Sequence, residues 1–186
     1  MTKESWQQQK VLKQNKQDVS PNDIIIMAKK IKKERDRVLF VILYLTAGRV
    51  SEVVRSLYRK DITEQIADNR RIILFKLNNR KNKDKVFKEL PIPYDKEKDL
   101  LDMIFPYLDR MEMEHCIFPI SKTRAYQIIK KEFGWNPHWI RHIRLTNLVT
   151  YQDFNDQFLV KFSGWCDSRP ARSYMEHRWK DILQKY

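Results

Sequence analysis

Glycine and cysteine are scarce in this sequence, and no apolar run is long. Of the 186 residues, three are glycine and two are cysteine. Cys116 and Cys166 lack the closely spaced partners of a zinc site, so we expect two reduced thiols and no metal. The run from Val38 to Ala47 is about half as long as a membrane span. Met1 to Asp18 lacks the apolar stretch of a signal peptide, so we expect a soluble, cytoplasmic protein.

Acidic residues are outnumbered by basic ones. The chain has 37 Lys and Arg against 24 Asp and Glu, which gives a net charge of +13 and a pI of about 9.7. This excess favours a polyanionic partner, nucleic acid before membrane. Hydrophobic residues make up 42% of the chain, enough for one folded domain with a core.

The pattern of apolar residues predicts a mainly α fold with a small antiparallel β-sheet. Residues 1–19 are polar and basic, as in a tail or linker, and residues 20–186 form the domain. Ser20-Pro21 is a typical helix start, and the apolar run within residues 35–47 predicts a buried, central helix. Further helices are expected at about 51–58, 95–110, 122–133, 139–151, 155–163 and 170–184, and strands at about 61–67, 71–77 and 85–91.

Arg49 follows the central helix at a turn, in the segment Thr46-Ala47-Gly48-Arg49-Val50-Ser51-Glu52. A partly buried guanidinium is unfavourable unless it meets an anion. That anion is either a ligand phosphate or the carboxylate of Glu52 in a structural ion pair. This segment alone does not decide between them.

The two strands between Arg70 and Lys88 enclose a polar, basic turn in which Asp84 is the single acid. A cationic hairpin suits contact with a DNA backbone. A solvated surface turn explains the same composition and is the commoner case.

His138 and Arg141 are one helical turn apart, so they share a face of their helix. Pro137 puts His138 in the first turn, where the helix dipole favours an anion. The pair suits a phosphate clamp, although such pairs are more often structural. Further along, Gly164-Trp165 is followed by Tyr174, ten positions after the glycine.

In order and spacing, these segments resemble the motifs of the tyrosine recombinase (phage-type integrase) family, which includes Cre-like and Xer-type enzymes. The first family motif reads T-G-x-R-[IV]-S-E, and Thr46 to Glu52 matches it with Ala47 at the glycine position. The second is a lysine in a β-hairpin. The third is H-x-x-R followed by His, as in His138 to His142, and the fourth is Gly-His or Gly-Trp ahead of the tyrosine. The resemblance covers about residues 20–180.

The resemblance implies a role for each matching residue. Arg49 and Arg141 would hold the non-bridging oxygens of a DNA phosphate, which a planar, permanently charged guanidinium suits. His138 would bind the phosphate or assist proton transfer. Trp165 stands where many relatives have a histidine and offers an indole N–H, so it cannot shuttle a proton. Tyr174 would attack phosphorus.

The hairpin lysine is the least fixed assignment. Counting back from Pro91 against the family pattern G-K-G-x-K-x-R-x-x-P gives Lys83, but the flanking glycines are absent, so Lys81 and Lys85 remain candidates. In the family this lysine protonates the departing 5′ oxygen. Contacts with DNA are expected from Arg80, Lys81, Lys85, Lys122, Arg124 and Arg144.

The implied function is a site-specific DNA recombinase. It would cut and rejoin double-stranded DNA through a 3′-phosphotyrosine, without metal, ATP or another cofactor. No carboxylate cluster for magnesium is evident, and Glu52 would support Arg49 rather than bind a metal. The tail after Tyr174 would either join a homotetramer on DNA or pack on its own domain.

Three other functions remain open from the residues. A type IB topoisomerase would relax supercoils by the same chemistry, and a silent DNA-binding module would keep the fold without activity. An RNA-binding protein would need base-stacking aromatics on a sheet, whereas the predicted strands offer Phe75 and Phe87, which look like core. The high lysine and isoleucine content suggests an archaeal or viral source. Also open are a missing N-terminal domain and whether Tyr174 acts in its own subunit.

Overall fold

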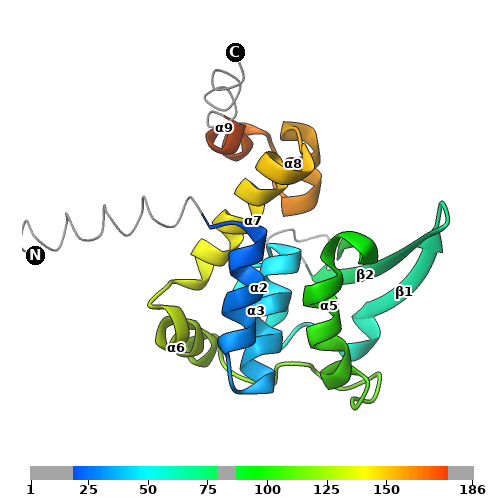
Figure 1. Cartoon of the computed structure of the whole chain (residues 1–186), viewed down its shortest axis with the longest axis vertical. Helices are drawn as coiled ribbons and strands as arrows, with labels where there is room; N and C mark the ends of the chain where they lie inside the picture. The colour runs from blue at the N-terminus through cyan, green and yellow to red at the C-terminus, as the bar shows by residue number, and fades with distance from the viewer. Residues whose placement is uncertain (1–18, 79–86, 176–186) are drawn as a thin grey trace, which may run out of the picture.

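The computed structural model describes residues 19–78 and 87–175, which form a helical body with one small sheet (Figure 1). This agrees with the expected class, mainly α with a small antiparallel sheet. The elements are α2 (Pro21–Lys30), α3 (Glu34–Thr46), α4 (Val50–Val53), the 3-10 helix η1 (Arg59–Asp61), β1 (Ile62–Ala67), β2 (Arg70–Asn78), β3 (Phe87–Pro93), α5 (Tyr94–Leu108), α6 (Lys122–Phe133), α7 (Pro137–Gln152), α8 (Asp156–Ser163) and α9 (Arg169–Met175).

Helix α3 is the centre of the body, as its apolar run predicts. Every residue from Val38 to Thr46 is buried. Because the helix is apolar on all sides, it packs against α2, α5, α6 and α7 at once. The preceding helix, α2, begins where expected, with the Ser20 hydroxyl accepting a hydrogen bond from the backbone N–H of Asp23 at 3.2 Å.

The sheet has the antiparallel strand order β1-β2-β3. Along β2 the side chains alternate, so Phe75 points into the core. Strand β3 tolerates Pro91 and Pro93 because it is at the edge of the sheet. Phe87, expected in the core, is instead 57% exposed at the start of β3.

The third expected helix, at 51–58, is wrong in length, because α4 ends at Val53. Arg55 then adopts a left-handed conformation with φ of 59°. Its backbone N–H donates to the carbonyl of Phe118 at 3.1 Å, so pairing with a distant segment replaces the helical bonds. Sequence periodicity does not reveal such a competing partner.

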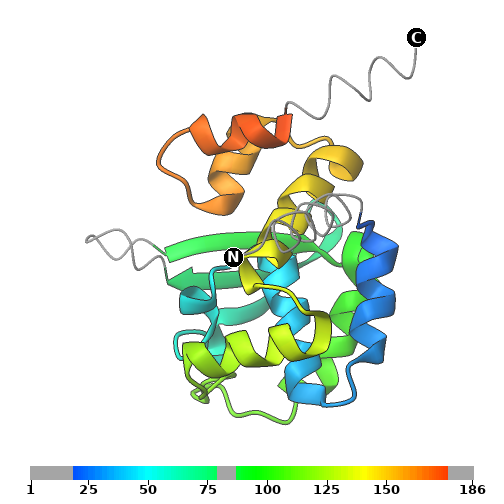
Figure 2. The same cartoon turned by 90° about the vertical axis from the view of Figure 1, so that its left-hand side faces the viewer.

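Helices α8 and α9 lie together at one end of the molecule, and α7 connects them to the body (Figures 1 and 2). The sheet and α6 lie in the body, on opposite sides of α3 in Figure 1. The last expected helix, at 170–184, is described as α9 up to Met175, and its remainder lies outside the described residues. Within the described ranges, no helix combines the length and apolarity needed to cross a bilayer.

Candidate active site

The turn after α3 positions the first arginine. The Thr46 hydroxyl donates to the carbonyl of Ile42 at 2.6 Å and accepts from the backbone N–H of Gly48 at 3.1 Å. Ala47 is left-handed, with φ of 44°. A Cβ on Gly48 would lie 2.8 Å from the Thr46 hydroxyl oxygen, so the tight turn requires glycine there. The chain therefore leaves α3 in one defined direction, toward Arg49.

Arg49 forms the ion pair with Glu52 that its sequence left open. The guanidinium Nη1 donates to Glu52 Oε1 at 2.5 Å, and the Arg49 backbone N–H donates to Oε2 at 2.9 Å. Glu52 is buried, whereas the Arg49 side chain is 25% exposed. The buried carboxylate thus holds the guanidinium in place, and part of the arginine side chain stays accessible to solvent.

Arg141 is held by the carboxyl ends of two helices. Its Nη1 donates to the carbonyl of Ala47, at the end of α3, at 2.5 Å, and its Nη2 to that of Ser163, the last residue of α8, at 3.1 Å. Helix carboxyl ends favour a cation. Burial, followed by the charge of Arg49, lowers the pKa of Arg141 to about 10, so the group stays charged at neutral pH. A guanidinium has more N–H donors than these bonds use, so donors remain for a ligand.

A pocket of about 300 Å³ lies beside these two arginines. None of its described lining residues is acidic. It is therefore suited to a small anion such as a phosphate. The lining residues are Gly48, Arg49, Val50, Ser51, Lys122, Tyr126, Pro137, His138 and Arg141.

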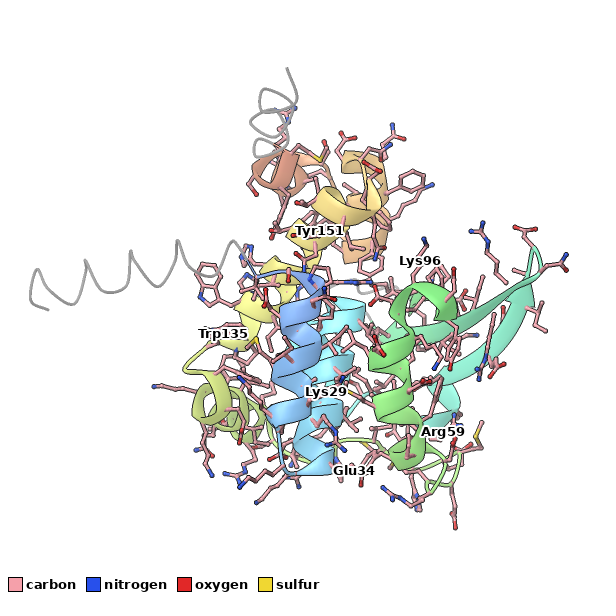
Figure 3. All side chains as sticks on the ribbon, in the orientation of Figure 1. Lys29, Glu34, Arg59, Lys96, Trp135 and Tyr151 are labelled. Atoms are coloured by element: carbon pink, nitrogen blue, oxygen red, sulfur yellow. The ribbon has the colours of Figure 1, made fainter. Side chains whose placement is uncertain are left out.

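His138 enters the pocket from the first turn of α7. Its backbone N–H donates to the side chain of Asn136, the N-cap, at 2.9 Å. The preceding turn is anchored by rings, with Trp135 against Phe133 at 5.4 Å and Phe133 against Phe40 of α3 at 4.6 Å. Trp135 is labelled on this turn in Figure 3. The start of α7 is therefore tied to the central helix.

Tyr174 lies in the site of its own chain. Its side chain is buried, and its ring stacks against both Trp165 at 5.9 Å and His142 at 5.6 Å. The hydroxyl is 2.5 Å from Nδ1 of His142. Trp165 in turn lies under the guanidinium of Arg141, at 5.5 Å. Burial raises the pKa of Tyr174 to about 12, and the charge of Arg141 offsets part of that increase.

Lys88 is a buried cation that sequence reasoning missed. It lies on the inward face of β3, is 7% exposed, and donates to the carbonyl of Thr46 at 3.3 Å. Its ammonium also lies 5.4 Å from the ring centre of Phe162. Burial and then the charge of Arg141 lower the pKa of Lys88 to about 7, although Glu52 acts in the other direction. The alternation of β3 was the available signal, since it places this lysine in an inward row.

Arg144 was expected to contact DNA, and that expectation is wrong. The residue is 2% exposed. Its Nη1 donates to Glu97 Oε1 at 2.5 Å, and its guanidinium lies 5.0 Å from the ring centre of Tyr44. The side chain instead joins α7 to α5 and α3.

The other residues expected at the site have different outcomes. Lys122 is exposed and lines the pocket. Arg124 is exposed on α6, away from the pocket, in a second hollow of about 290 Å³ with a cluster of lysines. The hairpin residues Arg80, Lys81, Lys83 and Lys85 lie outside the described residues. Within residues 19–78 and 87–175, no group of three or more His, Cys, Asp or Glu side chains is arranged to hold a metal ion.

Two solved structures of similar fold are complexes of a site-specific recombinase with its substrate. The XerH site-specific recombinase bound to palindromic difH substrate, a post-cleavage complex, has a TM-score of 0.64 and 15% identity, over 87% of this chain and 49% of that chain. The pre-cleavage complex of XerH with difH substrate has a TM-score of 0.61 and 16% identity, over 88% of this chain and 51% of that chain. No family model and no characterised protein matches the sequence.

The chain therefore has the tyrosine recombinase catalytic-domain fold that its motifs predict. It spans about half the length of the solved recombinases that it matches.

Proposed function

We propose that this chain is the catalytic domain of a site-specific DNA recombinase that works through Tyr174. The observation that carries the proposal is the pairing of a buried tyrosine with a cationic pocket in one chain. Tyr174 contacts Trp165, which contacts Arg141, and Arg141 lines the pocket with Arg49. The similarity in fold to the site-specific recombinase XerH bound to its difH substrate supports the same proposal.

The pocket would bind the phosphate that is cut. A phosphodiester resists attack because it is anionic, so neutralising it is the main electrostatic task. Arg49 and Arg141 would take its non-bridging oxygens, and His138 would donate a further hydrogen bond. Each arginine is already fixed by bonds to its own chain, so little reorganisation is needed when DNA binds.

Tyr174 would attack the bound phosphorus. The Oη–P bond forms as the bond from phosphorus to the 5′ oxygen breaks, which leaves a 3′-phosphotyrosine and a 5′-hydroxyl. The new bond conserves the phosphodiester linkage, so rejoining needs no ATP. The side-chain cations supply the charge that a metal ion supplies in other phosphoryl-transfer enzymes, and the leaving oxygen takes a proton from a lysine or from water.

Double-stranded DNA is the proposed partner. The net charge of +13 and the exposed Lys122 and Arg124 on α6 favour contact with phosphates. Recombination also requires a homotetramer on two duplexes, which the tail after Tyr174 would join. A type IB topoisomerase would use the same site without strand exchange. Recombinant products from two duplexes support the recombinase, and relaxation alone supports the topoisomerase.

Relaxation of supercoiled plasmid in EDTA tests the chemistry. We expect the wild-type protein to relax the plasmid and to leave DNA covalently bound to protein after denaturation. Tyr174→Phe should lose both, because it keeps the ring and removes the nucleophile. Tyr151→Phe is the matched control, because Tyr151 is 58% exposed near the end of α7, where it is labelled in Figure 3.

Relaxation by Tyr174→Phe at the wild-type rate would contradict the proposal. DNA binding without cleavage by the wild-type protein would favour a silent DNA-binding module of this fold.

A further inference from the structure

The hydroxyl of Tyr174 contacts a histidine other than the one that lines the pocket. We propose that His142 is the catalytic residue that accepts the proton of Tyr174 during attack on the phosphate. This inference rests on the function proposed above and assigns the proton step within it. His138, which would bind the phosphate, is then left with a separate task.

The two rings are arranged for a proton transfer. The hydroxyl oxygen of Tyr174 is 2.5 Å from Nδ1 of His142, close enough for a proton to pass directly between them. The rings lie 5.6 Å apart and nearly parallel, at 28°. Trp165 stacks on the same tyrosine at 5.9 Å, so packing on both α7 and the segment before α9 limits movement of the phenol.

The surroundings of His142 keep its ring neutral. The charged and titratable groups that face it are His138 and Arg141 from its own helix and Tyr174 from α9. Burial, then His138 and Arg141, lower the pKa of His142 to about 4. At neutral pH, a ring nitrogen can therefore accept a hydrogen bond from the phenol. The tautomer that does so carries its proton on Nε2.

A bound phosphate would change this balance in the required direction. The pKa of His142 is low partly because Arg141 is close, and an anion on Arg141 offsets that effect. The phenol proton also becomes more acidic as the oxygen begins to bond to phosphorus. The proton thus moves from Oη to Nδ1 while the Oη–P bond forms, and it returns to the tyrosine when the 5′-hydroxyl reverses the step.

The neighbouring groups are less suited to this task. His138 is exposed, lines the pocket, and meets His142 edge-on at 4.8 Å. Burial, Arg141 and Arg49 lower the pKa of His138, which suits a neutral hydrogen-bond donor to phosphate. Trp165 has an indole N–H and no basic nitrogen, so it cannot accept a proton.

The test is the pH dependence of covalent adduct formation on supercoiled plasmid, with protein in excess over DNA. We expect His142→Asn to slow adduct formation by about 10²–10⁴-fold at pH 7, the usual range for loss of a general base. The rate of His142→Asn should then rise about tenfold per pH unit toward the pKa of Tyr174, because hydroxide replaces the missing base. His115→Asn is the matched control, on an exposed loop with a side chain 60% exposed.

Three outcomes contradict the inference. A rate for His142→Asn equal to wild type would do so directly. A rate lowered by the same factor at every pH would reduce His142 to a packing role. Absence of adduct with the wild-type protein would contradict the proposed function itself, and this inference with it.

A measurement on the unaltered protein avoids any folding defect of the variant. Nitrogen NMR of the labelled imidazole should report a neutral ring, protonated on Nε2, from pH 8 down to pH 5. A ring protonated on Nδ1, or a charged ring at pH 7, would overturn the inference.

Discussion

At the scale of single residues, positively charged side chains outnumber carboxylates in the site. Arg49, Arg141 and Lys88 act on one another electrostatically, and Glu52 is the carboxylate among them. Each additional buried positive charge lowers the pKa of its neighbours and destabilises the fold. The same excess makes the pocket attractive to an anion. The residues that weaken the free protein are thus those suited to bind a phosphate.

The cost of a buried charge to stability can be measured at Lys88. Its pKa is about 7 in the folded protein against 10.5 in an exposed lysine. The unfolded chain therefore holds more protons between these values, so stability rises with pH across that window. Lys88→Met should raise the free energy of unfolding by about 2–4 kcal/mol at pH 6, allowing for the lost bond to Thr46. This increase in the free energy of unfolding should become smaller toward pH 10, and urea unfolding at several pH values measures it.

A gain that is independent of pH would contradict this explanation, because it would place the effect in apolar packing. Lys76→Met is the matched control, since that side chain is 43% exposed and paired with Glu89 at 3.1 Å on the sheet surface. We expect a change within about 1 kcal/mol at either pH for this variant.

The motif residues could be predicted from sequence, and their supporting contacts could not. Arg49, Arg141 and Tyr174 were assigned to the site because their types and order match a known pattern. The contact between His142 and Tyr174 depends on where α9 docks, 32 positions along the chain. Arg144 was assigned wrongly for the same reason, since its partner Glu97 comes from α5, 47 positions away.

At the scale of elements, the turn from α3 to α4 holds the arginines in place. Its carbonyls accept from Arg141 and Lys88, and its glycine allows the close approach of Thr46. Ala47 occupies the position where the family motif has glycine, and its left-handed conformation costs an alanine about 1 kcal/mol. The family glycine therefore has a conformational explanation in this structure.

Two neighbouring variants test this turn. Gly48→Ala should lower the free energy of unfolding by about 1–3 kcal/mol, because its Cβ would lie 2.8 Å from the Thr46 hydroxyl and 3.0 Å from a methyl of Val53. Ala47→Gly should instead leave stability unchanged or raise it by up to about 1 kcal/mol. Denaturant unfolding measures both. A larger loss for Ala47→Gly than for Gly48→Ala would contradict this description of the turn.

The long elements followed from the sequence, as did the short helix α8 and strand β1, whereas the length of α4 did not. Helix α6 begins at Lys122 and ends at Phe133, as its amphipathic pattern predicts. Helix α4 is shorter than predicted, because the backbone N–H of Arg55 donates to the carbonyl of Phe118 instead of continuing the helix. The position of helix α7 was predicted well. Which of its faces are buried was not, because that depends on how many elements pack around the helix.

At the scale of the whole molecule, the site combines residues of the body with residues of the end that holds α8 and α9. Arg49, His138 and Arg141 belong to the body or to the helix leaving it, whereas Tyr174 is on α9 at the end of the molecule (Figure 2). Tyr174 reaches the site of its own chain, where it contacts His142. The chain spans about half the length of the solved recombinases it resembles in fold.

The most direct measurement identifies the residue that becomes attached to DNA. Adduct trapped on plasmid would be digested with nuclease and protease, and the modified peptide sequenced by mass spectrometry. We predict a nucleotide-bearing phosphotyrosine at Tyr174. A modification on Tyr186 or on any other residue would contradict the assignment of the nucleophile and, with it, the mechanism built on this site.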